Sequence, residues 1–245
     1  MQAFPIPAPR FTGGSRRVDA GSAWNWLTQG WAMFIAHPGT WIAMMVILIV
    51  IYLGLAIVPL VGQLAAHVLT PVLAGGMLIA CQKVADEQTP AIADLFAGFQ
   101  RSTGALATLG VLYMLGMLAV FLVIVLLAGG GLAGGMMLNQ SLAAGIAVGS
   151  LLLAMLLGML LTVPLLMAIW FAPALVVFNG MQPVDALKAS FNACLKNVLV
   201  FTVYGLFTMV LCFFAALPVG LGFLVLGPVL AGSVYASYKD IFLAT

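Results

Sequence analysis

Charged residues are scarce in this chain, with eight Lys or Arg and six Asp or Glu among 245 residues. They make up 6% of the sequence, whereas a soluble domain carries roughly 25%. Because 64% of the residues are hydrophobic, polar side chains are too few to cover a surface that faces water. The composition excludes an ordinary soluble domain and predicts an all-α, polytopic membrane protein. The net charge of +2 is too small to indicate nucleic acid as a partner.

Charge is also missing from the interior of six apolar runs, each long enough for the roughly 20 residues that a transmembrane helix needs. The runs are 41–61, 64–84, 105–128, 151–178, 198–217 and 219–238. Proton- and ion-coupled transporters normally carry a charged residue inside such a run, so these classes are disfavoured. We expect the fourth run to be tilted or broken at Pro164, and residues 129–150 to cap the outer surface or re-enter the bilayer.

Motifs that carry chemistry are missing as well. The three cysteines, Cys81, Cys194 and Cys212, form no CxxC pair, and an odd number argues against a disulfide framework. No GxSxG, HExxH, DxD or phosphate-binding loop occurs. His67 lies inside a run and could serve as a metal ligand or proton relay, but no second ligand follows at a suitable spacing, so a hydrogen-bonded or headgroup-facing histidine is favoured. We therefore expect neither enzyme activity nor a metal or cofactor.

The charges that do occur fall on one side of the predicted membrane. They are Arg10, Arg16, Arg17 and Asp19 before the first run, Lys83, Asp86, Glu87, Asp94 and Arg101 around the end of the second, Asp185, Lys188 and Lys196 after the fourth, and Lys239 and Asp240 after the sixth. The positive-inside rule then predicts that both termini are cytoplasmic. The first residues lack the apolar stretch of a signal peptide, so we expect a disordered cytoplasmic tail over 1–21 and one membrane domain over 22–245.

A short segment with the same pattern precedes the first, third and fifth runs. Each segment has apolar residues at positions i, i+3 and i+7, which give a helix one apolar face: Trp24, Leu27 and Trp31, then Ile92, Leu95 and Phe99, then Val184, Leu187 and Phe191. A small residue precedes each last aromatic residue, namely Gly30, Gly98 and Ser190. Trp24, Trp31, Phe99 and Phe191 are expected to anchor these helices at the inner membrane surface, with lipid or partner binding as the alternative.

Each short segment leads into two runs, and the second of these carries a proline. TPVLAGG at 70–76 matches GPVLAGS at 227–233. The pattern predicts three parallel repeats, about 22–84, 89–180 and 183–242, each with an interfacial helix and a helical hairpin. Parallel repeats favour pseudo-symmetry about the membrane normal, although irregular packing of duplicated units is the alternative. Helix kinks are expected at Pro71, Pro164, Pro173 and Pro228, either to shape the bundle or to line a polar cavity with freed carbonyls.

Several motifs carry a resemblance to a known group of proteins. They are DLFAGF (94–99), WFAPALVVF followed by P.DALKASF (170–191), and GPVLAGSVYASYKDIF (227–242). They resemble uncharacterised proteobacterial six-helix inner-membrane proteins, which are distantly similar to YciC-like proteins and to the membrane domain of some glycerophosphodiester phosphodiesterases. The resemblance covers nearly all of 20–242 and implies a location in the plasma (inner) membrane of a Gram-negative bacterium. Its motifs are structural, so it implies no catalytic residue.

Two functions fit these patterns. A non-enzymatic membrane scaffold or accessory subunit of a membrane complex is favoured, because the runs lack buried charge and the short helices have apolar faces. The alternative is a protein that binds or transports a lipid or a small neutral solute in a cavity between the proline-kinked hairpins. The lipid bilayer is the expected partner in both cases, and an accessory role would add another membrane protein.

Overall fold

The computed structural model describes residues 11, 13–136 and 140–243, and the regular structure in these residues is helical apart from one isolated bridge between Phe11 and Leu243. The elements are α1 (Ser22–Ala36), α2 (Pro38–Ala56), α3 (Val61–Ala85), η1 (Ile92–Phe96), α4 (Gly98–Arg101), α5 (Thr103–Met136), α6 (Gln140–Trp170), α7 (Ala172–Asn179), α8 (Pro183–Lys196), α9 (Val198–Ala216) and α10 (Phe223–Phe242). The predicted all-α class is confirmed.

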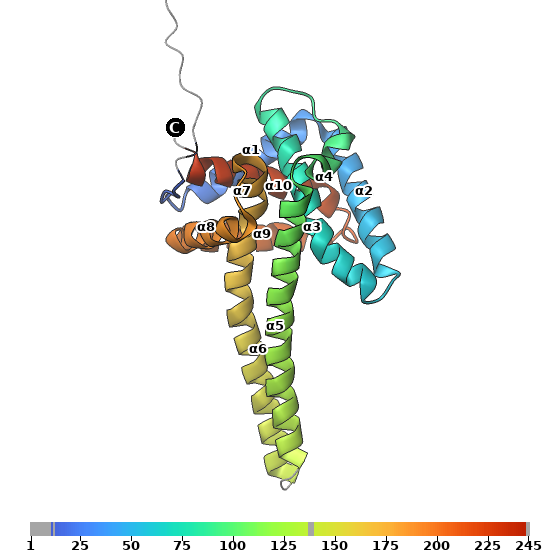
Figure 1. Cartoon of the computed structure of the whole chain (residues 1–245), viewed down its shortest axis with the longest axis vertical. Helices are drawn as coiled ribbons and strands as arrows, with labels where there is room; N and C mark the ends of the chain where they lie inside the picture. The colour runs from blue at the N-terminus through green and yellow to red at the C-terminus, as the bar shows by residue number, and fades with distance from the viewer. Residues whose placement is uncertain (1–10, 12, 137–139, 244–245) are drawn as a thin grey trace, which may run out of the picture.

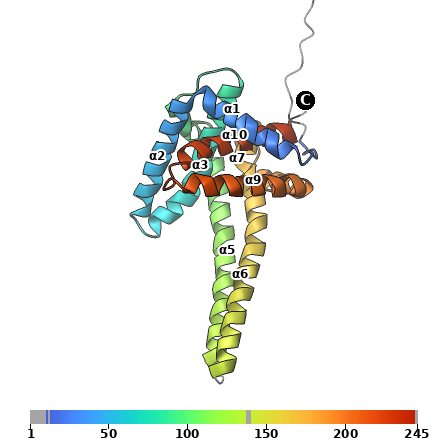
Figure 2. The same ribbon diagram turned by 180° about the vertical axis from the view of Figure 1, so that it is seen from behind.

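A long antiparallel hairpin, formed by α5 and α6, projects from a head that the other helices build (Figure 1). In both views α8 and α9 run across the direction of this hairpin (Figure 2). The chain between Arg101 and Asp185 contains no charged residue, so all the charges of the described residues belong to the head. The hairpin is therefore an uncharged, apolar projection.

Five helices of the described chain are long and apolar enough to cross a membrane. They are Pro38–Ala56, Val61–Ala85, Thr103–Gly131, Ala144–Asn179 and Val198–Ala216. The sixth predicted run, 219–238, also forms a helix, α10, which is not among the five. The reason is its second half, which carries tyrosines, serines, Lys239 and Asp240, and much of α10 is buried within the head. A sixth span thus stays a prediction.

The segment over 129–150 differs from the expectation of a surface cap or a re-entrant loop. Its described residues continue α5 to Met136 and begin α6 at Gln140. The glycines of this segment therefore do not end the helix. With 34 residues and 1.5 Å per residue, α5 is about 51 Å long, more than the roughly 30 Å of a bilayer hydrocarbon core.

The fourth predicted run is broken, but seven residues after Pro164, which lies inside α6. The break is at Phe171, between α6 and α7. The Ser190 hydroxyl stands where an ordinary helix bond would join Phe171 N to Met167 O. It accepts from Phe171 N at 2.9 Å and donates to Met167 O at 2.7 Å. An inserted side chain of this kind is a known cause of helix breaks, and Pro173 favours a new start because it lies in the first turn of α7.

Each predicted repeat has a short segment followed by two long helices, and the second of these, α3, α6 or α10, is its returning helix. The three short segments pack on the returning helices in cyclic order. A Cβ on Gly30 of α1 would lie 2.1 Å from the carbonyl oxygen of Val229 in α10. A Cβ on Gly98 of α4 would lie 2.1 Å from the carbonyl oxygen of Val72 in α3. The third small residue, Ser190 of α8, binds the junction of α6 and α7. The first segment therefore contacts the last returning helix, and the second and third segments contact the first and second.

The three junctions between a short helix and the following long helix share one backbone conformation. His37, Ser102 and Asn197 have φ values of −143°, −152° and −118°, and ψ values of 58°, 36° and 28°. These dihedral angles end one helix and turn the chain into the next. Each junction therefore redirects the chain in a similar way.

Candidate functional site

The first long helix of each predicted repeat, α2, α5 or α9, is its outgoing helix. Two of these outgoing helices pack closely on the returning helix of another repeat. A Cβ on Gly110 of α5 would lie 2.5 Å from the carbonyl oxygen of His67 in α3. A Cβ on Gly227 of α10 would lie 2.5 Å from the methyl group of Met45 in α2. The third combination, α6 with α9, is different, because a groove of about 520 Å³ lies between these helices. The groove is the candidate functional site.

The groove is lined by uncharged and mostly apolar side chains of α6, α8 and α9. They belong to Val163, Leu166, Met167, Trp170, Cys194, Val198, Phe201, Thr202, Tyr204, Thr208, Met209 and Cys212, and Gly205 adds backbone. Because both long helices are candidate membrane spans, this surface suits a hydrocarbon chain. A charged group would lose its hydration here without gaining a partner.

Two unpaired polar atoms belong to this lining. Among the residues that the structure describes, the buried side-chain polar atoms without a hydrogen-bond partner are Trp170 Nε1 and Thr208 Oγ1. The Trp170 ring packs edge-on against Phe201 and Tyr204, with centroids 6.0 and 5.9 Å apart. An unsatisfied buried polar atom costs about 1–3 kcal/mol. A ligand that brought an acceptor into the groove would remove this cost after a small shift of these side chains.

Tyr204 and Cys194, two further polar residues of the groove, have partners. The Tyr204 hydroxyl lies 2.6 Å from Ser233 Oγ of α10. Cys194 Sγ lies 3.5 Å from Met167 O, and burial raises the pKa of the Cys194 thiol to about 12. A thiol with such a pKa stays protonated at neutral pH, whereas the thiolate is the nucleophile. Cys194 is therefore part of the wall rather than a reactive group.

A second groove, of about 390 Å³, lies on another side of α9, against α1 and α10. Two of the predicted interfacial residues, Trp24 and Trp31, line it and are 58% and 50% exposed. Trp24 packs on Phe207 of α9 at 5.7 Å. Phe99 and Phe191 lie on α4 and α8 and do not line this groove. The structure thus brings together two of the four predicted contact residues.

His67 lies on α3 and contacts its own helix and α5. Its Nδ1 is 2.8 Å from Gln63 O, and its ring stacks on Tyr113 at 6.3 Å. Within the described residues, no three His, Cys, Asp or Glu side chains come close enough to hold a metal ion. His67 therefore packs between two helices. Of the predicted kink positions, Pro71, Pro164 and Pro228 are inside α3, α6 and α10, and Pro173 opens α7.

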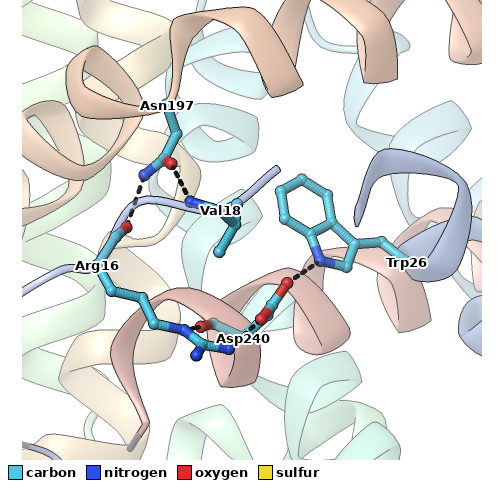
Figure 3. A network of polar contacts seen from close by, with 5 residues as sticks. All are labelled: Arg16, Val18, Trp26, Asn197 and Asp240. Atoms are coloured by element: carbon cyan, nitrogen blue, oxygen red, sulfur yellow. Dashed lines mark hydrogen bonds and ion pairs between the residues drawn. The ribbon is translucent and has the colours of Figure 1, made fainter. Parts of the chain in front are cut away.

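Residues 15–18 contact the head, although they belong to the predicted disordered tail; residues 1–10 and 12 lie outside the described part. Asn197, at the junction of α8 and α9, accepts from Val18 N at 2.9 Å and donates to Arg16 O at 3.0 Å (Figure 3). The Arg16 side chain pairs with Asp240 of α10, which also accepts from Trp26 Nε1 at 2.9 Å. The sequence gives no signal for this network, since its members are far apart in the chain.

One comparison with known proteins is decisive for the family. A protein of Burkholderia thailandensis, described as a probable inner membrane protein, is 32% identical over 228 residues, which cover 89% of this chain and 82% of the relative. The chain belongs to the family of this inner-membrane protein. No family model matches the chain, and no solved structure matches it. With its five apolar helices, it is an inner-membrane protein with transmembrane helices.

Proposed function

We propose that the protein binds the chains of an uncharged, ester-linked membrane lipid in the groove between α6 and α9. The observation that carries this proposal is the groove itself, which is apolar, opens between two candidate spans and contains Trp170 Nε1 and Thr208 Oγ1 without partners. Both groups can donate a hydrogen bond, and an ester carbonyl can only accept one. The lining has no Lys or Arg, so nothing in it would compensate a buried phosphate.

We also propose a topology for this protein, in which three parallel units surround a pseudo-three-fold axis along the membrane normal. The cyclic contacts of Gly30, Gly98 and Ser190 support it, as do the similar junctions. In this arrangement α10 is the sixth span and both termini are cytoplasmic, in agreement with the one-sided charges. A distant relationship to YciC-like proteins rests on the sequence motifs and is part of the same proposal.

Filling the groove is expected to displace the lipid. A Cβ on Gly205 would meet no described atom within 4 Å, so Gly205→Phe can place a ring in the groove without a clash. We expect the lipid that copurifies with the protein in polymer discs to fall by about tenfold or more, the effect of losing 1.4 kcal/mol, as measured by native mass spectrometry and lipid analysis. Gly54→Phe on α2 also enters open space, away from the groove, and serves as the matched control. Equal lipid content in the two variants would contradict the proposal.

Removing the two donors is expected to weaken binding only of lipids that carry carbonyl groups. Thr208→Val keeps the shape and deletes the O–H, and Trp170→Phe keeps a smaller aromatic ring and deletes the N–H. If each bond is worth about 1 kcal/mol, the double variant binds a fluorescent diacylglycerol about tenfold or more weakly. Its affinity for the ether-linked dialkyl analogue should not change. A parallel loss for both probes would mean that shape alone recognises the lipid.

A scaffold or accessory subunit is the second candidate, and the α5–α6 hairpin favours it. The hairpin is longer than the hydrocarbon core, and Gly145 and Gly149 face open space within the described residues. Small residues one turn apart allow another helix to approach closely. Native mass spectrometry separates the two functions, because a stoichiometric protein partner whose binding is insensitive to Gly205→Phe would favour the scaffold.

A further inference from the structure

The helix α9 is less tightly held than the other two outgoing helices. Helix α5 packs on α3 through Gly110, and α2 packs on α10 through Gly227. In contrast, a groove of about 520 Å³ lies along α9, and a second groove of about 390 Å³ between α1 and α10 reaches α9 at Leu211. Most of its large apolar side chains are exposed, including Leu199, Leu206 and Met209. The α5–α3 and α2–α10 contacts are thus closed, whereas the corresponding contact between α9 and α6 is open.

The movement that would close the third contact has a natural pivot at Asn197. This residue ends α8 and precedes α9, so rotation of its backbone would swing α9 without disturbing either helix. Helix α8 itself is fixed, because Ser190 binds Met167 O and Phe171 N. A swing of α9 towards α6 would bury the apolar groove surface, and burial stabilises at about 25 cal/mol per Å². The contacts of α9 with α10 and α1, among them Tyr204 with Ser233 at 2.6 Å and Trp24 with Phe207 at 5.7 Å, offset part of this gain in the open arrangement, and a restraint at Asn197 would add to them.

The N-terminal segment 15–18 is positioned to do so. Its backbone binds the Asn197 amide at Val18 N and Arg16 O, with distances of 2.9 and 3.0 Å (Figure 3). Its other side is fixed to the end of α10, where Arg16 N donates to Ile241 O at 2.9 Å and the guanidinium pairs with Asp240. Asn197 is only 3% exposed, and its Nδ2 also donates to Ala193 O at 2.9 Å, so departure of the segment would leave the amide oxygen as the unsatisfied group. The segment ties the pivot of α9 to α10, away from α6.

We propose that α9 is a lid over the α6–α9 groove and that residues 15–18 are a latch that holds it open. With the latch released, α9, which runs across the hairpin (Figure 1), turns about Asn197 towards α6 and gives up its Tyr204 contact with Ser233 of α10. The groove closes in this movement and expels its ligand. The lid regulates access to the groove. It rests on the proposed function only for the identity of the ligand that the groove binds.

The distance between α6 and α9 tests the lid directly. Nitroxide labels are attached to Leu160→Cys on α6 and Leu206→Cys on α9, both exposed positions, in a background with Cys81→Ala, Cys194→Ser and Cys212→Ser. Pulsed electron paramagnetic resonance in lipid discs then gives the distance distribution. Asn197→Ala, which removes the side chain that the latch binds, is expected to shift it to the short distances of packed helices, whose axes are about 8–10 Å apart.

The controls keep the outcome interpretable. Arg17→Ala changes an exposed neighbour in the same segment and should leave the wild-type distribution. If Asn197→Ala does not fold, Arg16→Ala removes the exposed ion pair with Asp240 and should add a second, shorter population. A folded Asn197→Ala or Arg16→Ala protein with the wild-type distribution would overturn the lid. The measurement needs no added lipid, so failure of lipid binding in the Gly205→Phe experiment leaves its result unaffected.

Discussion

Replacing Gly30 by valine is expected to unfold the head of the protein. A Cβ at this position would lie 2.1 Å from Val229 O and 2.8 Å from Ser233 N. Both are backbone atoms of α10 and cannot turn aside as a flexible side chain can. Overpacking typically costs about 1–3 kcal/mol and occasionally more, and a clash with helix backbone belongs at the upper end. We therefore expect a loss of about 3 kcal/mol or more, seen as a lower midpoint of thermal unfolding in detergent.

The same change at two other glycines makes the test specific. Gly98→Val should be as damaging, because its Cβ would lie 2.1 Å from Val72 O. Gly54→Val places the same side chain in open space on α2 and should unfold near the wild-type temperature. Equal stability of the Gly30 and Gly54 variants would show that α1 does not pack on α10 through Gly30.

A single arginine in the middle of the α5–α6 hairpin is expected to prevent membrane insertion. Leu156 of α6 is 67% exposed, so the side chain of Leu156→Arg would face lipid if the hairpin crosses the bilayer. Insertion scales assign about 2.5–3.5 kcal/mol to an arginine at the centre of a membrane-spanning helix. The expected result is a large drop in membrane-integrated protein, measured with a fluorescent fusion after membrane fractionation.

The control for this variant lies on the charged side of the molecule. Leu195 of α8 is 55% exposed and next to Lys196, where an arginine keeps its hydration. Leu195→Arg should therefore insert at the wild-type level. If both variants insert equally well, the hairpin does not lie in the hydrocarbon core.

The helices and the small residues of the fold could be predicted from local patterns. Apolar residues at i, i+3 and i+7 mark the faces of α1 and α8 that carry Trp31 and Phe191, and the small residues Gly30, Gly98 and Ser190 each lie at a close contact. The partner of each face could not be predicted, because a periodic pattern indicates which side of a helix is apolar but not which helix covers it. The break at Phe171 could not be predicted for a related reason, since the hydroxyl that causes it comes from Ser190 on α8.

The candidate site was less predictable than the fold. Proline positions suggested a cavity between the hairpins, but the groove depends on an open contact between α6 and α9, and no local pattern encodes an open contact. Trp170 and Thr208 look in the sequence like ordinary members of apolar runs, and only their missing partners single them out. Asn197 reads as a helix-end residue, and its bonds to Arg16 and Val18 join positions 181 and 179 residues apart.

The contact between α1 and α10 has a consequence for how the protein is made. Trp26 donates to Asp240, a partner 214 residues further along the chain. Ribosomes add about 5–20 residues per second, so α1 emerges roughly 10–40 seconds before its partner exists. During that time the apolar face of α1 must rest on the membrane surface or on a chaperone. Helix α10, synthesised long after α1, is thus the one that completes the folding of α1.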